Sequence, residues 1–502
     1  MPFGTLKLKA GVDVIETPTY DAAQLTASML IRFYKGLPQK RGGWIARTMV
    51  ALLGKCNALH GWADLGVSTW LGIGTDHVSG SSLEVMNSVG VLTDITPTPA
   101  PVFPGVWSLD NFGQVLLAAP FESEIFSWTP GDPAAVAVGG SSPHNSGSIL
   151  VMPQVQIVLS LSSETGTVFN PLLVRWCDAG DYTSWTPTAT NQAGSYVIPQ
   201  GSFIVGGIAS GLNVLVWTDV GVTGMTYQGL PFVFGFQPIA TGCGLFGRRS
   251  VGVIGTRVMW LAGTSGIDPD NDSTPIGFFQ MTLGATPPAP MECDVWDIFT
   301  ANAEIADTDR FFMAVTEPFN EFELFFPLSH SSPFYVASSV EWGSIKYNMV
   351  DNAWDYTFSP QLQRTAWEHS SPVGSPVGAD LTGIIQQHER GYNANGEGMV
   401  WSWQTGDFDL AQGEEMVLVD WLIPDFATNG TSPTINLTVG ARVASNAPAV
   451  TQTKTVTQST YWTPNFALRG RQFYLAADGS DLGSFNRLGA IRYRAAPDGR
   501  GP

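Results

Sequence analysis

The stretch WCDAGDYTSWTP, residues 176–187, places two Asp, a Gly, several hydroxyl side chains and two Trp within twelve positions. An Asp followed by Gly after an apolar run is typical of a tight turn, because the carboxylate accepts bonds from turn N–H groups and Gly tolerates positive φ. A trailing Trp can cover the hairpin. The stretch therefore predicts a β-hairpin with Asp178 as a turn-capping acceptor and Trp185 as its lid.

The pattern Trp-x-Asp-x-Gly, followed by a hydroxyl and a bulky residue, occurs three times. The copies are Trp62, Asp64 and Gly66; Trp176, Asp178 and Gly180; and Trp217, Asp219 and Gly221. With Trp107 and Trp260 these Trp residues lie 45, 69, 41 and 43 positions apart. Propeller blades repeat at about 40–50 residues. The spacing predicts an all-β fold with a β-propeller-like body, one turn reused blade after blade, and a long insertion in one blade.

Short apolar or alternating runs bounded by Gly, Asn, Asp or Pro dominate the rest of the chain, as expected for antiparallel strands. Hairpins are predicted at residues 312–327 and 345–356, and the best helix candidate is Asp21 to Arg32. Three regions follow from this survey, listed here in chain order: an irregular N-terminal arm (1–45), the β-propeller-like body with inserted loops (46–400) and additional C-terminal β structure (401–502).

The composition indicates large buried surfaces, because 44% of the residues are apolar and only 13% are charged, against about 25% charged in a typical soluble domain. Such a composition fits contacts between subunits. The net charge of −19 argues against gripping nucleic-acid phosphates, which requires Lys and Arg. It is compatible with a like-charged wall past which DNA slides.

Four widely separated cysteines, Cys56, Cys177, Cys243 and Cys293, form no C-x-x-C pair. They are expected to be buried free thiols. The first 18 residues contain no apolar signal-peptide core, and no run of about 18 apolar residues predicts a membrane span. We therefore expect synthesis in a cytoplasm and no membrane span.

Candidate sites for chemistry are few. Asp268, Asp270 and Asp272 have the spacing of oxygen ligands for Ca²⁺, but they lack the Gly and distal Glu of an EF-hand loop, so a solvated loop is favoured. None of the histidines has ligand spacing; they are His60, His77, His144, His330, His369 and His388. These observations predict no catalytic residues, no cofactor and no firm metal site.

The stretch at 176–187 also resembles the Asp-box turn of sialidase-like β-propellers, although Trp185 lies two residues too far from Asp178. A glycosidase needs two carboxylates flanking a cleft; the candidates are Asp64, Asp178, Asp219, Glu292, Asp294 and Asp297. The first three occupy turn positions where a carboxylate is structurally required. Arg248, Arg249 and Arg257 are the only mid-chain arginine group that could bind a substrate carboxylate. A sialidase-like glycan hydrolase is therefore an alternative rather than the leading hypothesis.

A series of distinctive motifs runs along the chain: residues 32–44 (RFYKGLPQKRGGW), 215–219, 225–236, 241–245, 293–299, 364–367, 403–409, 423–426 and 487–500. In their shared order these motifs resemble the tail nozzle (tail hub, or packaged-DNA stabilisation) proteins of short-tailed bacteriophages. The resemblance spans nearly the whole chain.

The resemblance implies a structural virion protein in the phage tail, assembled in the host bacterial cytoplasm. Six copies would form a ring below the portal and its adaptor, contact tail fibres or spikes, enclose the DNA channel and retain packaged genome. Double-stranded DNA would pass through the channel without specific binding. A receptor-binding tail module is a further alternative that these observations leave open.

Overall fold

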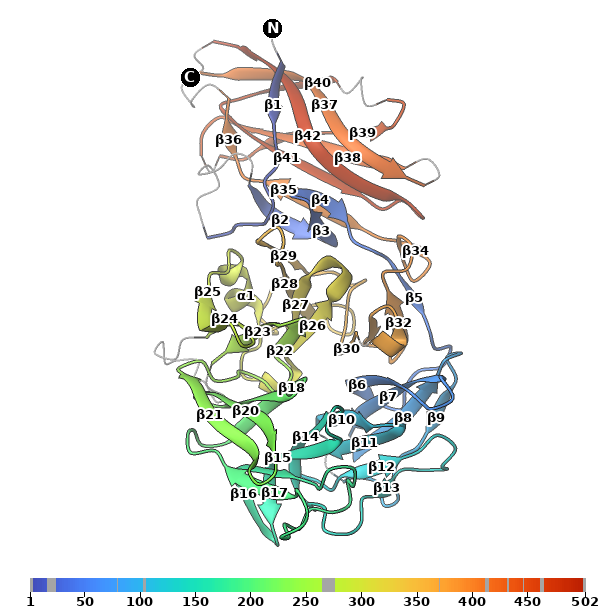
Figure 1. The fold of residues 1–502 in the computed structure, drawn as a ribbon. Coiled ribbons are helices and arrows are strands. Elements are labelled where there is room, and N and C mark those ends of the chain that lie inside the picture. Colours follow the sequence, from blue (N-terminus) through green and yellow to red (C-terminus); the bar gives the residue numbers. More distant parts are fainter. Residues whose placement is uncertain are drawn as a thin grey trace.

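The computed structural model describes residues 3–15, 24–78, 80–102, 105–263, 276–369, 371–410, 415–430, 433–445, 447–460 and 465–499. The fold is almost entirely β, as the sequence predicts, and consists of two modules (Figure 1). The lower module in Figure 1 is a ring of small antiparallel sheets, and the upper module is a pair of larger sheets.

The described part of the ring contains seven sheets, of which six are four-stranded antiparallel meanders and the seventh includes one parallel pair, β5 with β33. The first four are β6 (Lys55–Ala63), β7 (Thr69–His77), β8 (Gly80–Asn87) and β9 (Leu92–Asp94); β10 (Trp107–Phe112), β11 (Val115–Pro120), β12 (Phe126–Trp128) and β13 (Val136–Ala137); β14 (Ser146–Met152), β15 (Ile157–Thr165), β16 (Val168–Trp176) and β17 (Gly194–Val197); and β18 (Ile204–Ser210), β19 (Asn213–Thr218), β20 (Gly221–Gly229) and β21 (Val233–Thr241).

The remaining three sheets of the ring follow in chain order, except for one strand. They are β22 (Val251–Ile254), β23 (Arg257–Ala262), β24 (Gly277–Thr282) and β25 (Thr286–Met291); β26 (Phe312–Thr316), β27 (Glu321–Pro327), β28 (Trp342–Asn348) and β29 (Ala353–Thr357); and β30 (Ala366–Glu368), β31 (Val377–Ala379), β32 (Ile385–His388), β5 (Trp44–Ala46), β33 (Asn393–Ala394) and β34 (Glu397–Gly398). The helical segments are α1 (Trp296–Asn302) and three single turns, η1 (Thr308–Arg310), η2 (Glu317–Phe319) and η3 (Ser371–Val373).

The first strands of successive sheets line the centre of the ring. Strand β6 lies beside β10, β10 beside β14, β14 beside β18, β22 beside β26, β26 beside β30, and β30 again beside β6. The fourth and fifth sheets meet where Trp217 packs on Trp260, with ring centroids 5.5 Å apart. This closed order is the arrangement of a β-propeller with the seven sheets as blades. The last blade is completed by β5, which pairs with β32 although it precedes the whole ring in the sequence.

The second module is a sandwich of two sheets. One contains β3 (Ile31–Tyr34), β4 (Leu37–Lys40), β42 (Phe485–Pro497), β37 (Val417–Asn429) and β40 (Asn465–Gly470), with β1 (Phe3–Leu6) also paired to β42. The other contains β2 (Leu25–Met29), β35 (Trp401–Thr405), β41 (Gln472–Gly479), β38 (Thr434–Arg442) and β39 (Val450–Thr457), with β36 (Phe408–Asp409) also paired to β41. Their inner faces share one core, to which β38 and β41 contribute alternate residues.

The N-terminal arm predicted over residues 1–45 needs correction. Residues 3–6, 25–29, 31–34 and 37–40 are strands, and all of them belong to the sandwich. The helix predicted from Asp21 to Arg32 is also wrong for residues 24–32, which form β2 and the start of β3. Long-range pairing outweighs the local helix propensity of the segment, since β2 pairs with β35 and β4 with β42. The propeller is therefore inserted into the sandwich, between β4 and β35.

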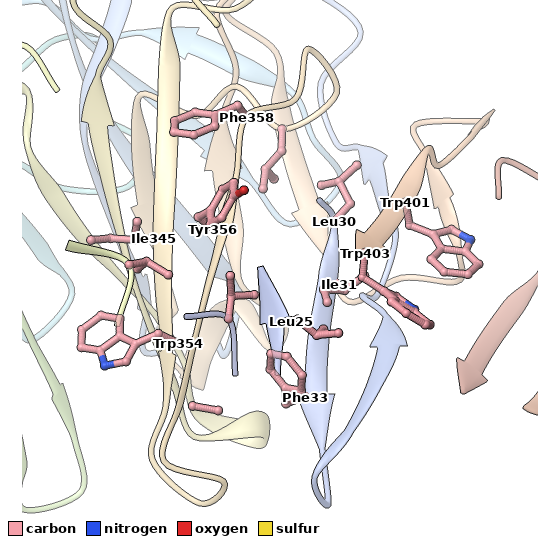
Figure 2. Packing of buried hydrophobic residues seen from close by; sticks show 14 of the residues in the cluster. Leu25, Leu30, Ile31, Phe33, Ile345, Trp354, Tyr356, Phe358, Trp401 and Trp403 are labelled. Atoms are coloured by element: carbon pink, nitrogen blue, oxygen red, sulfur yellow. The ribbon is translucent and has the colours of Figure 1, made fainter. Parts of the chain in front are cut away.

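A continuous apolar core joins the two modules (Figure 2). Trp354 and Tyr356 on β29 face Leu25 and Phe33 on the N-terminal strands, and Trp403 on β35 lies on the far side. A hydrogen bond also links the two modules here, because the Ser28 hydroxyl on β2 donates to the Tyr356 carbonyl on β29 at 2.9 Å. The modules thus share buried surface rather than a flexible linker.

Candidate functional site

The three Trp-x-Asp-x-Gly motifs do not occupy equivalent places in the blades. Asp64 follows the first strand of its blade, Asp178 the third strand and Asp219 the second. The prediction of one turn reused blade after blade is therefore wrong. The motif encodes only a strand end followed by a turn, and any hairpin of a blade can use that sequence.

Asp64 caps the turn between β6 and β7. Its carboxylate accepts the Ser68 N–H at 2.9 Å and the Trp70 indole N–H at 3.0 Å. These two bonds hold the pKa of Asp64 below its ordinary value. The left-handed residue of the turn is Val67, with φ of 60°, and not Gly66 as the motif predicts. Trp62 is buried and donates to the Gln114 carbonyl in the next blade at 3.1 Å.

Asp178 organises the loop between β16 and β17. One carboxylate oxygen accepts the N–H groups of Ala179 at 2.9 Å and Gln192 at 2.7 Å. Gly180 has φ of 80°, a conformation that glycine adopts without strain. Trp185 is 1% exposed, and its indole donates to the Tyr182 carbonyl at 2.7 Å. Asp178 therefore acts as a backbone acceptor and Trp185 as a buried lid.

Asp219 reaches back across its blade. Its carboxylate accepts the Ser202 N–H at 2.8 Å, whereas the Thr218 hydroxyl accepts the Gly221 N–H of the turn itself at 3.2 Å. Gly221 lacks a positive φ; a side chain there would collide with the Ala240 carbonyl, 2.4 Å from an ideal Cβ. The close approach of two strands explains this glycine.

Replacing Asp178 by Ala is expected to lower the free energy of unfolding by about 1–3 kcal/mol, because two loop N–H groups lose their acceptor. Asp178→Asn is the matched control, since an amide oxygen can accept the same bonds. Urea unfolding of the two variants and the parent measures the difference. Equal stability of the Ala variant and the parent would contradict the assigned role.

The arginines considered for substrate binding are engaged elsewhere. Arg248 lies over the Phe121 ring, 3.6 Å from its centroid, and donates to the Asp309 carboxylate at 3.2 Å. Arg249 donates to the backbone carbonyls of Asn57 and Asp309 and so ties two blades together at the centre of the ring. Burial lowers the pKa of Arg249 to about 10.

The carboxylates considered for glycoside cleavage lie on different blades and on the segment that follows β25. Asp64, Asp178 and Asp219 belong to the first, third and fourth blades. Glu292 and Asp294 follow β25, and Asp297 lies in the first turn of α1. Arg257, the third arginine considered, bonds Gln280 at 2.7 Å. Asp64, Asp178 and Asp219 therefore lie on three separate blades, whereas Glu292, Asp294 and Asp297 follow one another after β25.

The Ca²⁺ candidates Asp268, Asp270 and Asp272 lie outside the described residues. Within the described ranges, no group of three or more His, Cys, Asp or Glu side chains has metal-binding geometry. The four cysteines are free and buried, as predicted. No helix in the described part of the chain has the length and apolar character needed to span a bilayer.

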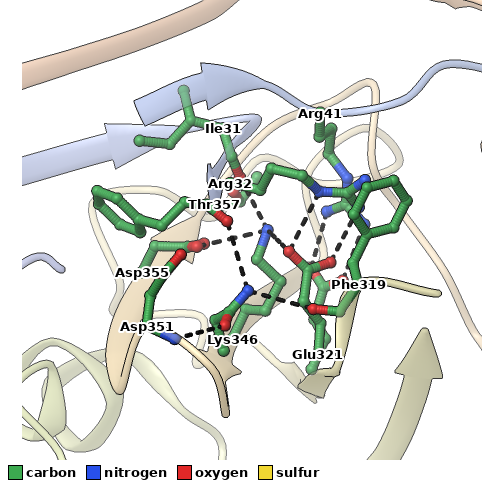
Figure 3. A network of polar contacts seen from close by, with 12 residues as sticks. Ile31, Arg32, Arg41, Phe319, Glu321, Lys346, Asp351, Asp355 and Thr357 are labelled. Carbon is green, nitrogen blue, oxygen red and sulfur yellow. Dashed lines mark hydrogen bonds and ion pairs between the residues drawn. The ribbon is translucent and has the colours of Figure 1, made fainter. Parts of the chain in front are cut away.

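A cluster of buried charges joins blade six to the N-terminal strands (Figure 3). Arg32, 1% exposed, donates to both oxygens of Glu321 at 3.1 and 2.9 Å. It also donates to both oxygens of Glu389, at 2.9 and 2.7 Å. Burial acts to lower the pKa of Arg32, but the two carboxylates outweigh it and raise the pKa. We call this cluster, with Arg41, Glu323, Lys346 and Asp355, the junction network.

Arg41 and Glu323 form the third bidentate pair of the junction network. The two guanidinium nitrogens lie 3.0 and 2.9 Å from the two carboxylate oxygens. The Ser344 hydroxyl adds a bond to Glu323 at 2.8 Å. Burial acts to raise the pKa of Glu323, but Arg41, Lys346 and these bonds lower it to about 2. Glu323 is therefore ionised at neutral pH.

Lys346 completes the network from β28. Its ammonium donates to the Ile31 carbonyl at 2.8 Å and lies 3.4 Å from Asp355 and 3.8 Å from Glu321. Burial raises the pKa of Asp355 to about 7, although Lys346 opposes the shift. Nothing in this arrangement holds a reacting atom, because the charges are bonded to one another or to the backbone. The junction network therefore has a structural role: it fixes the orientation of the propeller relative to the sandwich.

The junction network is not predicted by any of the sequence motifs. The available signal was EFELFFP, residues 321–327, where two glutamates alternate with aromatic and aliphatic residues in a strand whose every residue is buried. Buried carboxylates require cationic partners. Arg32 lies 289 positions from Glu321 and Arg41 lies 282 positions from Glu323, so no local pattern could assign these partners.

No family model matches the chain, and no curated protein sequence matches it. One similar solved structure is the crystal structure of the computationally designed Ika8 protein, with 11% sequence identity and a TM-score of 0.39. The match covers 76% of this chain and 99% of that chain. At this identity and TM-score the similarity carries no conclusion about function.

Proposed function

We propose that this chain is a structural virion protein, the tail nozzle subunit of a short-tailed bacteriophage. Six copies form a ring below the head-to-tail adaptor, retain packaged DNA and conduct it during ejection, and tail fibres or spikes attach to the same ring. The chain has no catalytic role in this proposal.

The observation that carries the proposal is where the motifs of the nozzle resemblance lie. Residues 32–44, 364–367, 403–409 and 487–500 are far apart in the sequence, yet each has a residue near the junction of the modules; Trp403 belongs to the apolar core that joins them (Figure 2). Trp44 lies beneath Arg364, 5.1 Å from its guanidinium carbon. Gln39 pairs with Arg487. Because these motifs lie close together in the structure, they support an architecture shared with the nozzle proteins rather than a chance resemblance of short segments.

The low content of charged residues, 13% of the chain, supports subunit contacts. The net charge of −19 per chain supports a channel wall that repels DNA and keeps it from sticking.

The purified full-length protein is expected to assemble into a six-fold ring, alone or on its adaptor, with a channel of DNA width. Light scattering after gel filtration should report about six times the 53.8 kDa chain mass. Electron microscopy of the same sample, or of isolated tails, should show the ring. A protein that stays monomeric in both preparations and cleaves glycans would contradict the proposal and favour the hydrolase.

A further inference from the structure

A groove of about 760 Å³ lies where the propeller meets the sandwich, beside the junction network. This junction groove is lined by residues from five segments, among them Tyr34, Phe319, Tyr392, Asn429 and Arg487. Its volume is in the range of small-molecule and peptide side-chain sites. Its lining combines aromatic rings with three cations, Arg32, Lys40 and Arg487, and one carboxylate, Glu389, which Arg32 binds.

Arg487 is held rigidly in this groove. It lies on β42 opposite Gln39 of β4, and its Nε donates to the Gln39 amide oxygen at 2.7 Å. The guanidinium carbon lies 4.7 Å from the ring centroid of Tyr34 and 5.4 Å from that of Phe485. Gln39 is itself 8% exposed. A guanidinium fixed at Nε and stacked on two rings keeps its outer nitrogens in one orientation.

Arg487 also differs from the other two cations of the groove. Arg32 is bonded to two glutamates, and Lys40 donates to the Ser484 carbonyl at 2.9 Å. By contrast, no carboxylate of the described chain bonds Arg487. Farther along the same strand, Arg494 is paired with Asp420 at 2.8 Å. The Nη1 and Nη2 groups of Arg487 therefore offer a bidentate donor pair that no acceptor among the described residues uses.

The aromatic rings around Arg487 determine which class of anion the groove favours. A guanidinium fork matches the two oxygens of a carboxylate, and it also accepts phosphate. The rings of Tyr392 and Phe485, 5.4 Å apart, form an aromatic wall beside it. Such a wall favours a ligand with an apolar body over a compact hydrated anion. We propose that the junction groove binds an organic carboxylate, with Arg487 taking the carboxylate and the aromatic wall taking the apolar body.

Sodium benzoate tests this proposal, with sodium acetate and sodium phosphate as comparison ligands at constant ionic strength. Isothermal titration of the full-length protein should show saturable benzoate binding, about tenfold tighter than acetate because of the ring, and weaker binding of phosphate. Arg487→Gln should weaken benzoate binding by about tenfold or more, since it removes a charge-assisted bidentate contact. Arg487→Lys should give an intermediate loss.

Arg494→Gln is the matched control, because it removes the same charge from the same strand and should leave benzoate binding unchanged. A crystal or electron-microscopy structure of the unsubstituted protein with benzoate should place the carboxylate on Arg487, whatever the stability of the variants. Absence of benzoate binding, equal loss in the Arg494 variant, or benzoate located elsewhere would each overturn the proposal. Binding of phosphate in preference to benzoate would replace it with a phosphate site.

Discussion

Replacing Arg41 by Ala is expected to lower the free energy of unfolding by about 3–5 kcal/mol, because Glu323 is left as an uncompensated buried charge. The pair is buried, with Arg41 at 1% and Glu323 at 3% side-chain exposure. Urea unfolding followed by tryptophan fluorescence measures the effect. Arg494→Ala is the control: its pair with Asp420 is about one-third exposed, and such pairs contribute about 0–1 kcal/mol.

A double replacement separates the cost of the orphaned charge from the value of the pair. Arg41→Met combined with Glu323→Leu removes both charges and retains apolar volume. Buried pairs replaced in this way are often neutral or stabilising, so the double variant should recover most of the loss. If Arg41→Ala and Arg494→Ala destabilise equally, the buried junction network is not what holds the modules in place.

Replacing Trp44 by Ala is expected to cost about 3–5 kcal/mol, the range for large core residues. Trp44 is 1% exposed and lies on β5, the strand that completes the last blade, with its ring 5.4 Å from His388. Loss of this contact should loosen the closure of the ring, so hydrogen exchange should accelerate in β5 and β32 before the other blades.

Ile45 provides the neighbouring control, because it lies on the same strand with 46% of its surface exposed. Ile45→Ala should change stability by about 0.5 kcal/mol or less, as is usual for exposed positions. Uniform exchange throughout the propeller of the Trp44 variant, without a local increase at β5, would show that the ring does not depend on this strand for closure.

The sequence predicts local hairpins well. The hairpins at 312–327 and 345–356 are present as β26–β27 and β28–β29, with Asn320 and Asn352 in the left-handed conformation at their turns. These turns depend on adjacent residues, so their signals are local. The all-β class and the propeller-like body follow from the same kind of signal repeated along the chain.

The misassigned blade register has a physical cause. The innermost strands begin at residues 55, 107, 146, 204, 251, 312 and 366, so the blades differ in length. Trp residues pack at blade interfaces from whichever strand faces the neighbour: Trp62 and Trp107 are on first strands, whereas Trp217 and Trp260 are on second strands. The spacing of these Trp residues along the sequence therefore indicates the length of a blade, but not which strand of the blade carries the Trp.

The sandwich and the junction network depend on partners that are distant in sequence. Gln39 pairs with Arg487, and Arg32 pairs with Glu321. Strands β2 and β3 pack against β29 and β35. This long-range packing outweighs the helical pattern of residues 24–32. Local patterns in a single sequence do not indicate which distant strands will pair. Neither the sandwich nor the junction network could therefore be predicted from the sequence.

The insertion of the propeller between β4 and β35 also sets an order of events during synthesis. The strands β1 to β4 leave the ribosome before the propeller, and β3 can pair with β4 at once. The other partners, β42 for β1 and β4 and β35 for β2, lie in residues 401–497. The propeller, in contrast, has all its strands once residue 398 has emerged. During translation β1, β2 and the β3–β4 hairpin must therefore wait for their sandwich partners while the ring folds. A chain halted before β42 would carry a finished propeller with no completed sandwich to orient it.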